Sequence, residues 1–575
     1  MSFQVLLDKL VDETTQRSLF QFSPEIALSV TIVSLLLVRL FDLDRWMKPY
    51  WVALTGAIVA FAISYFQFMY IQRGPGELAD HWLFSHICEW LNLLDGSQDG
   101  PASVSGPFFT GLMVYDHFTV FFRLFLLLFL ILVIALTVLS GIPDNEDGPD
   151  FYTLLFGSTI GMLMMAGANN LLILFLGIEM TSVPSYALVG FLKGRKQSSE
   201  AALKYVVYGA GAAGIMLYGI SLLAGLCGTA DLGLIAEKLQ LLFGNQTEQV
   251  GMGDPTVRTI VLALLMIMVG IAFKLSLFPF HFWCPDAFEG ASAEVGGFLS
   301  VASKAATFAL LVRLCLAFVG DNAGALANVG LYLGLGLGVL AAVTATYGNL
   351  TAYCQTNVKR MLAYSTIAHA GYMLMAVASL MVILNGEGIS AAVKTKQAQG
   401  CLEGLLYYLA VYLFMNLGAF AIVALIRNQI FSEEIEAYNG LAGQTPVLCV
   451  CMLLCMFSLI GIPPLGGFFA KMMVFYSLFE AGNIHWMMWV VLCVGGLNTV
   501  FSLFYYLRVL KAMFLAERPA DAKTAKIPLK SSTGAYVLLV TVPVLLFGIA
   551  PPLMQGLSQT ATNVAADILM QIASR

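Results

Sequence analysis

Apolar segments long enough to cross the hydrocarbon core of a bilayer recur from one end of this sequence to the other. Of its 575 residues, 59% are hydrophobic and 11% are charged, which is too little polar surface to coat a water-soluble particle. We therefore expect an all-α polytopic membrane protein. Fourteen spanning helices are predicted, near residues 23–41, 51–70, 112–140, 151–169, 170–190, 203–226, 257–279, 294–319, 325–347, 361–385, 402–428, 445–480, 486–515 and 531–555.

Charge and cysteine usage exclude several other classes of protein. The net charge of −6 leaves no basic stripe for a nucleic-acid backbone, so we expect no nucleic-acid partner. The first 22 residues mix both charge signs and do not indicate a cleaved signal peptide. Cys449, Cys451 and Cys455 come closest to a metal-binding spacing, but they lie in an apolar helix without a histidine, so no metal site is predicted.

The distribution of lysine and arginine predicts an orientation in the membrane. Cytoplasmic loops collect these residues. With the N-terminus outside, fifteen of the 29 cations fall in inner loops, eight in outer loops and six within spans. Both termini are therefore expected on the outer, periplasmic side. The outer loops 71–111 and 227–256 are long and acidic, and we interpret them either as additions without a chemical role or as contacts for partner subunits.

Two predicted spans contain residues that interrupt a helix. The seventh includes "FKLSLFPFH", and the twelfth includes "SLIGIPPLGGFFAK", with Pro463 and Pro464 followed by two glycines. Irregular backbone at membrane depth has to be enclosed by protein or water. The breaks are five helices apart, which predicts that helices 4–8 and 9–13 are inverted repeats, an arrangement typical of transporters.

Ionisable residues within the spans are the main candidates for function, because a charge at the bilayer centre is costly and normally faces a protein interior or a water-filled path. The candidates for a proton relay are Glu179, Lys204, Lys274, Lys304, Lys471, His281 and His369. Lys204 also follows Glu200 at the i,i+4 spacing of an ordinary surface ion pair. Arg313 is interpreted as an anchor near an interface, and Arg123 as a structural partner of Asp116.

Lysine suits a relay because burial disfavours its charged form, whereas a nearby carboxylate favours it. Glu179 close to Lys274 would keep that lysine protonated. Withdrawal of Glu179 would release the proton toward Lys304, through water or His281. A change in charge separation alone would then move a proton, which is the hypothesis that these residues support.

Several long motifs resemble those of a known family. They are "LFLGIEMTSVPSYALVG", "SSEAALKYVVYGA", "FKLSLFPFHFWCPDAFEGA", "NVKRMLAYSTIAHAGYML" and "LIGIPPLGGFFAK", and they are similar to the motifs of the subunit N family of proton-pumping NADH:quinone oxidoreductase, respiratory complex I. The likeness runs from about residue 150 to residue 515. At "EGASAEVGGFLS" the sequence departs from the family, which usually shows a proline after the alanine and lacks the acid at Glu294.

The resemblance implies an antiporter-like fold of fourteen helices and a proton-translocating subunit of an NADH:quinone reductase. It places the family's glutamate at Glu179, its lysines at Lys204, Lys274, Lys304 and Lys471, and its histidines at His281 and His369. It implies no cofactor in this chain, since NADH, FMN, iron–sulfur clusters and quinone belong to other subunits. The implied location is the cell inner membrane. The implied partners are antiporter-like paralogues, small membrane subunits and the lipid bilayer.

The predicted repeats divide the chain into four parts. Residues 1–150 form helices 1–3 with the long outer loop, 151–320 the first repeat, 321–515 the second repeat, and 516–575 an inner linker, helix 14 and an outer tail. Two other functions stay open. One is a subunit of a multi-subunit sodium/proton antiporter, which shares the glutamate–lysine arrangement, and the other is a membrane scaffold that transports nothing.

Overall fold

The computed structural model describes residues 18–79, 105–143, 147–244, 254–319, 325–388, 390–519, 523, 528, 531–550, 555–556, 558–559 and 562–566. The helices of the N-terminal half are α2 (Leu19–Gln21), α3 (Ser23–Leu40), α4 (Pro49–Ala79), α6 (His117–Ser140), α7 (Gly148–Ala166), α8 (Leu171–Val189), α9 (Lys196–Cys227), α10 (Leu232–Gly244), α11 (Pro255–Leu275), α12 (Trp283–Gly290) and α13 (Ala293–Leu316). Those of the C-terminal half are α14 (Ala325–Ala352), α15 (Val358–Asn385), α16 (Ala391–Ile430), α17 (Pro446–Ile460), α18 (Gly466–Gly482), α19 (Met487–Phe514) and α20 (Ser532–Ile549).

The fold is the predicted all-α membrane architecture. Within the described ranges, twelve helices are long and apolar enough to cross a membrane. Helix α7, with 19 residues, lies where the fourth span was predicted. Helices α17 and α18 together cover the twelfth predicted span, 445–480. Helix α10 lies inside the predicted outer loop 227–256 and packs against α9 and α14.

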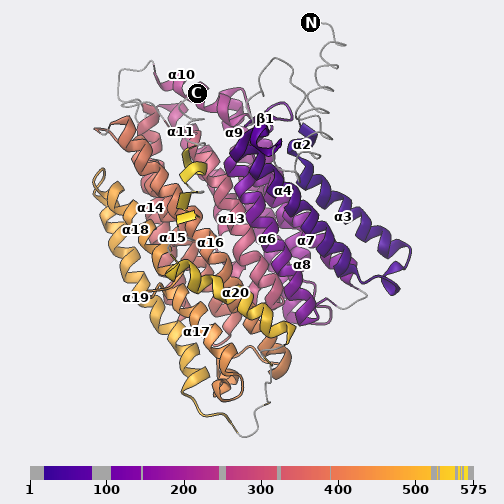
Figure 1. The fold of residues 1–575 in the computed structure, drawn as a ribbon. Coiled ribbons are helices and arrows are strands. Elements are labelled where there is room, and N and C mark those ends of the chain that lie inside the picture. Colours follow the sequence, from indigo (N-terminus) through magenta and orange to yellow (C-terminus); the bar gives the residue numbers. More distant parts are fainter. Residues whose placement is uncertain are drawn as a thin grey trace.

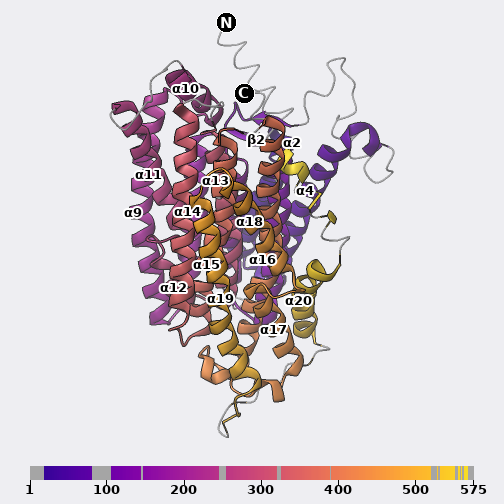
Figure 2. The same ribbon diagram turned by 90° about the vertical axis from the view of Figure 1, so that its left-hand side faces the viewer.

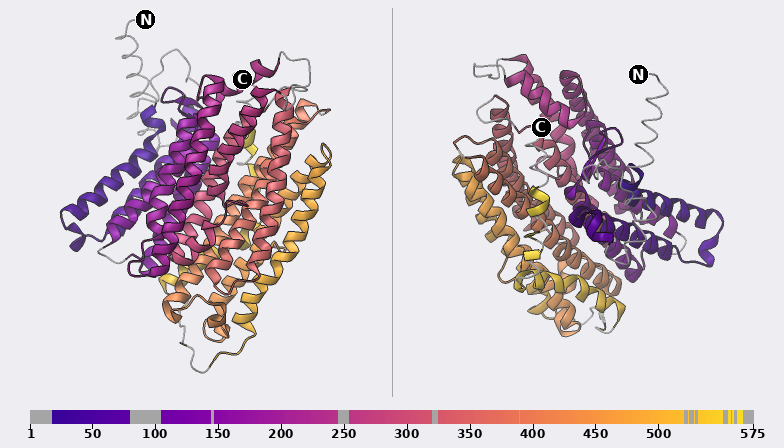
Figure 3. Two further views of the ribbon diagram at one scale, coloured as in Figure 1. Left: turned by 180° about the vertical axis from the view of Figure 1, so that it is seen from behind. Right: turned by 45° about the horizontal axis from the view of Figure 1, so that its top comes forward.

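The helices form a bundle in which the N-terminal helices lie on one side and the C-terminal helices on the other. Helices α3 and α4 make one flank, α14, α18 and α19 make the opposite flank, and α13, α15 and α16 lie between them (Figure 1). Turning the molecule shows α9 and α11 at a third edge (Figure 2), and the same order is seen from behind (Figure 3). All 24 residues of α13 are buried, so this helix is enclosed by protein on every side.

Small residues allow some helices to approach very closely. A Cβ atom at Gly348 of α14 would lie 2.7 Å from the backbone nitrogen of Ala368 in α15, and one at Gly371 would lie 2.8 Å from the carbonyl oxygen of Ala341. Helix association in lipid depends on such close van der Waals packing, because lipid tails provide no hydrophobic drive between helices. The pair α14 and α15 is therefore packed backbone against backbone.

Short backbone pairings join the connections at one end of the bundle. Strands β1 (Gly106–Phe108) and β2 (Met113–Tyr115) form an antiparallel hairpin. The amide of Val114 donates to the carbonyl oxygen of Gly167, at 2.8 Å, in the link between α7 and α8. That link also pairs with the segment before α10, since the Leu171 amide donates to the Ala230 carbonyl oxygen at 2.8 Å. These contacts fix the start of α8, which carries Glu179.

The expected pairing of Arg123 with Asp116 is wrong. Arg123 of α6 forms a fully buried ion pair with Glu25 of α3, at 2.7 Å. Asp116 instead caps α6, accepting from the Thr119 amide at 2.7 Å, and pairs with Arg313 of α13 at 2.8 Å. Because Arg123 follows Asp116 by two helical turns, its guanidinium reaches the neighbouring helix and not the cap. Arg313 is buried and also donates to the Ala166 carbonyl oxygen at 2.6 Å, so it holds α13 against α6 and α7.

Candidate functional site

The predicted break in the seventh span is confirmed. Helix α11 ends at Leu275, Ser276 adopts a left-handed conformation with φ of 58°, and α12 begins only at Trp283. Pro279, in the link, has no amide hydrogen with which to continue the helix. The last carbonyl groups of a helix have no partner within it, so α11 presents carbonyl oxygens inside the bundle. The indole of Trp283 takes one of them, donating to the Phe273 carbonyl oxygen at 2.9 Å.

Lys304 takes another of these carbonyl groups. Its ammonium lies 3.1 Å from the carbonyl oxygen of Leu275 in α11 and 3.1 Å from that of Thr366 in α15. Lys304 belongs to α13 and is buried. A cation at a helix C-terminus is stabilised by the partial negative charge of the carbonyl groups there. The break in α11 thus supplies the binding site for the ammonium of Lys304.

The predicted break in the twelfth span is confirmed and has the same chemistry. Helix α17 ends at Ile460, Gly461 has a φ of 89°, and α18 begins at Gly466 after two prolines. Lys471 of α18 reaches back and donates to the carbonyl oxygens of Leu459 and Ile460, at 3.0 and 2.9 Å. Its ammonium also lies 4.5 Å from the ring centre of Tyr372 in α15, a cation–π contact.

Lys274 lies in the last turn of α11 and is fully buried. Its ammonium donates to the hydroxyl oxygen of Ser182 in α8, at 3.0 Å. Glu179, one turn earlier on α8, is half-buried and interacts electrostatically with Lys274. No direct ion pair joins the two side chains among the described residues. Their charges therefore interact without a direct hydrogen bond.

His369 connects the two halves of the site. It lies on α15, one turn after Thr366, and is buried. Its Nδ1 atom is 2.7 Å from the hydroxyl of Tyr408, and its Nε2 atom is 3.3 Å from that of Tyr506. Thr366, one turn before it, accepts from Lys304, and Tyr372, one turn after it, lies under the ammonium of Lys471. The histidine therefore lies on α15 between the residue that contacts the first lysine and the residue that contacts the second.

His281 occupies the link between α11 and α12 but is not joined to the lysines by a hydrogen bond. Its ring centre lies 4.3 Å from that of Tyr347 and 4.5 Å from that of Phe282. Both ring nitrogens are buried and have no hydrogen-bond partner among the described residues. Buried polar atoms without a partner are rare in proteins, so these two nitrogens call for an explanation.

Lys204 lies apart from the buried row. Its side chain is partly exposed, and its ammonium pairs with Glu200 of α9 at 2.9 Å and with Asp286 of α12 at 2.8 Å. The first of these is the i,i+4 pair read from the sequence. Arg360 at the start of α15 also binds Asp286, at 2.6 Å. Lys204 therefore belongs to an ion cluster that ties α9, α12 and α15 together at one end of the bundle.

A second ion cluster, at the same end of the bundle as Lys204, is formed around Lys359. From the sequence, this lysine was counted among the cations of the inner loops. Lys359 is buried, and its ammonium lies 2.6 Å from the carbonyl oxygen of Ala291 and 2.9 Å from the carboxylate of Glu433. Glu294 is buried next to it and interacts electrostatically with it, and one Glu294 oxygen has no hydrogen-bond partner among the described residues. Of the ionisable residues in this cluster, the sequence analysis singled out only Glu294, because it departs from the family pattern.

Taken in order, the ionisable groups make a row over the contacting helices α8, α11, α13, α15 and α18, from the half-buried Glu179 through the buried Lys274, Lys304 and His369 to Lys471. A polytopic helical protein with two broken helices around buried ionisable groups has the architecture of ion-translocating membrane proteins. The fold and the site therefore place the chain among the ion-translocating membrane proteins.

Comparison with known proteins identifies the family. The family described as NADH:quinone oxidoreductase/Mrp antiporter, TM matches residues 168–498. A relative from Anaeromyxobacter sp. (strain Fw109-5), NADH-quinone oxidoreductase subunit N, is 38% identical over 455 residues, which cover 77% of this chain and 82% of the relative. The chain belongs to the NADH-quinone oxidoreductase subunit N family.

Solved structures show the same architecture. A chain of respiratory complex I from Thermus thermophilus with bound Aureothin is 27% identical, with a TM-score of 0.65, and the match covers 92% of this chain and 98% of that one. A chain of the Mrp complex from Dietzia sp. DQ12-45-1b has a TM-score of 0.69 over 96% of this chain and 99% of that one. At 18% identity, the second likeness shows the fold alone.

Proposed function

We propose that this chain is the proton-translocating membrane subunit N of an NADH-quinone oxidoreductase, and that protons pass along the row of buried groups. The observation that carries the proposal is the geometry at the two breaks. The break of α11 binds Lys304, which also donates to the Thr366 carbonyl oxygen, one turn before His369 on α15. Tyr372, one turn after His369, lies under the ammonium of Lys471, which the break of α17 binds. Each of these side chains can hold or release a proton, and each lies inside the protein.

The row can work as an electrostatic relay. A carboxylate near Lys274 stabilises the ammonium form of that lysine. When the charge of Glu179 moves away or is neutralised, the proton of Lys274 is released toward Lys304, whose ammonium shares the end of α11. Ser182, Tyr408 and Tyr506 supply hydroxyl groups that both donate and accept, so they can pass a proton along a hydrogen bond. His281, with two unpaired nitrogens, is proposed as a further carrier at the first break.

The proposal also covers the cofactors, the partner subunits and the location of the chain in the membrane. NADH, FMN, iron–sulfur clusters and quinone would be held by other subunits, and the energy of quinone reduction would reach this chain through neighbouring membrane subunits. We place the chain in a cell inner membrane with both termini outside, on the strength of the fifteen-to-eight excess of cations in the inner loops. Lys204 would then lie at the inner end of the row, where protons enter.

The decisive experiment measures proton pumping in inverted membrane vesicles with Lys274→Ala and the longer, uncharged Lys274→Met. NADH oxidation with a quinone acceptor gives the turnover, and a pH-sensitive dye gives the acidification. We expect acidification per turnover to fall at least about tenfold, since a positioned proton-transfer group contributes a factor of about 10² to 10⁴. Lys193→Ala, which removes an exposed lysine paired with Asp147, is the matched control.

Unchanged acidification at unchanged turnover would remove Lys274 from the pathway and favour a scaffold. A requirement for sodium in place of protons would favour the sodium/proton antiporter. A second measurement tests the link to Glu179. Because Glu179 acts through Lys274, the double variant Glu179→Gln/Lys274→Ala is expected to lose no more pumping than Lys274→Ala alone.

A further inference from the structure

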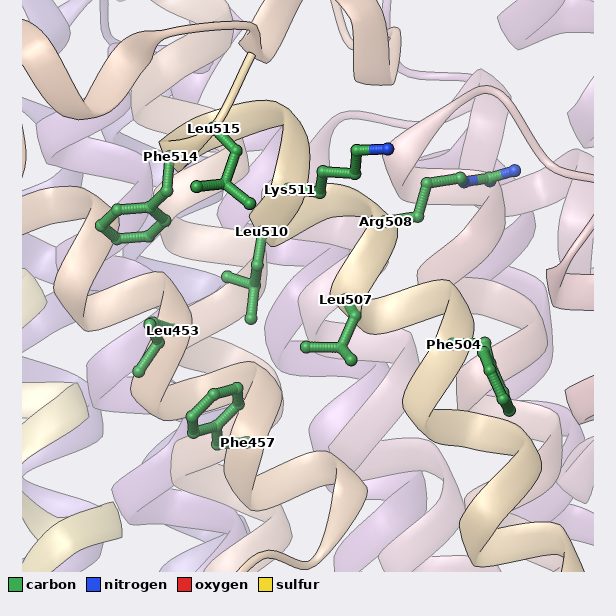
Figure 4. A pocket seen from close by; sticks show the side chains of 9 residues that line it. All are labelled: Leu453, Phe457, Phe504, Leu507, Arg508, Leu510, Lys511, Phe514 and Leu515. Atoms are coloured by element: carbon green, nitrogen blue, oxygen red, sulfur yellow. The ribbon is translucent and has the colours of Figure 1, made fainter.

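An apolar groove runs between α17 and α19 on the outside of the bundle (Figure 4). It has a volume of about 590 Å³ and is lined by Leu453 and Phe457 from α17 and by Phe504, Leu507 and Leu510 from α19. Phe504 and Leu507 are exposed. Since both helices lie in the membrane-spanning part of the chain, this groove faces the acyl chains of the bilayer.

Two basic residues of α19, Arg508 and Lys511, stand at the edge of the groove and extend to the same side (Figure 4). The guanidinium of Arg508 is fixed, because it donates to the carbonyl oxygens of Tyr353, at 2.7 Å, and Gln355. Lys511 is exposed, and its ammonium has no hydrogen bond or ion pair to the residues that the structure describes. The groove thus ends at one immobilised positive charge and one free ammonium.

A second, polar hollow of about 440 Å³ begins at the same two cations. Its walls include Thr356, Glu434, Glu436 and Asn439, and both glutamates are exposed. The hollow is preformed by backbone pairing, since the Ile435 amide donates to the Thr356 carbonyl oxygen at 2.8 Å. Along one path, the surface therefore presents apolar side chains, then positive charges, then negative charges.

We propose that the groove and the hollow together bind one phospholipid with a primary-amine headgroup. Its acyl chain would lie in the groove, its phosphate on Lys511 beside the charge of Arg508, and its ammonium on the carboxylates of Glu434 and Glu436. Basic pockets between membrane helices are known to bind phosphate headgroups. An anionic glycerol headgroup would leave two carboxylates facing a negative ligand, and a quaternary amine has no N–H with which to form the charge-assisted hydrogen bonds that Glu434 and Glu436 offer.

The test uses the intact complex in nanodiscs that contain a photoactivatable phospholipid of one acyl composition and one of three headgroups: ethanolamine, glycerol or choline. After illumination, cross-linked peptides from 446–460 and 487–515 are measured by mass spectrometry. The ethanolamine lipid is expected to label these peptides several-fold more than the other two. Lys511→Ala should reduce that labelling about fivefold, given what one surface lysine contributes to headgroup binding.

Two further variants make the test specific. Glu436→Gln should lower labelling by the ethanolamine lipid and leave labelling by the glycerol lipid unchanged or higher, because only the carboxylate distinguishes them. Lys196→Ala, at an exposed lysine of α9, should change nothing. Equal labelling by all three lipids, or labelling insensitive to Lys511→Ala, would mean bulk lipid only and would overturn the proposal. Cross-links from the groove to a neighbouring subunit, with no lipid label, would overturn it in favour of a protein contact.

Discussion

The ammonium nitrogen of Lys304 lies 3.1 Å from the carbonyl oxygen of Leu275, the last residue of α11, although the two residues are 29 positions apart and belong to different helices. The break in α11 and the lysine on α13 therefore form one unit. A continuous helix would have used that carbonyl group itself, and a lysine without it would have lacked a partner at this depth.

Replacing Lys304 by methionine is expected to stop pumping and weaken the fold. The carbonyl oxygen of Leu275, the last residue of α11, loses its donor, which costs about 1–3 kcal/mol for a buried group left unpaired. The carbonyl oxygen of Thr366 lies within α15 and keeps its helical partner. Acidification per turnover in inverted vesicles should fall at least about tenfold. Lys304→Arg provides the contrast: it keeps a donor for the two carbonyl groups but holds its proton permanently, so it should recover part of the thermal stability and none of the pumping.

His281→Phe separates stability from transport. The aromatic surroundings of His281 accept a phenyl ring, and the change removes two buried nitrogens that have no partner. We expect the midpoint of thermal unfolding of the purified complex to stay the same or rise, while acidification per turnover falls. A variant that pumps normally would show that His281 only packs the link between α11 and α12.

Gly461→Ala tests the second break. The φ of 89° at Gly461 lies in the left-handed region, where an alanine costs about 1–2 kcal/mol, and the new Cβ atom would lie 3.0 Å from the side chain of Lys471. Both thermal stability and pumping should therefore decline. Gly496→Ala in α19 is the matched control, because a Cβ atom there meets nothing within 4 Å. That helical substitution should leave stability unchanged or raise it by about 0.5–1 kcal/mol.

Asp116→Asn tests the buried ion pair with Arg313. Asparagine can still cap α6, so the variant removes mainly the charge. Leaving a guanidinium buried without its partner is expected to destabilise the fold by about 3–5 kcal/mol. Asp147→Asn breaks an exposed pair with Lys193 and should cost no more than about 1 kcal/mol. Equal unfolding midpoints of the two variants would contradict a structural role for Asp116.

The sequence was sufficient to predict the all-α membrane architecture and the two breaks, for a physical reason. Lipid leaves a chain little choice but helices, and Pro279, Pro463 and Pro464 cannot continue one. It also pointed to the ionisable residues within the spans. It could not tell which side chains meet across the bundle. Arg123 pairs with Glu25, 98 residues away, because packing sets the rotation of α3 and α6, and no local spacing encodes that rotation.

The sequence also did not determine how deeply each ionisable side chain is buried in the bundle. Lys359 follows a polar turn and was counted with the loop cations, yet it is buried against Glu433. Lys204 lies within an apolar segment and was considered for the relay, yet its side chain is partly exposed among carboxylates. Both positions depend on how far neighbouring helices extend beyond the segment that carries the lysine, which only the assembled bundle determines.

The complete enclosure of α13 has a consequence for the cation that it carries. A lysine on a peripheral helix can bend its stem toward the headgroups and so escape the hydrocarbon, but Lys304 has no lipid-facing side from which to leave. Its charge can be relieved only by the neighbours that already touch it. A larger side chain anywhere along α13 would therefore press on a neighbouring helix, and the position of Lys304 depends on that packing staying intact.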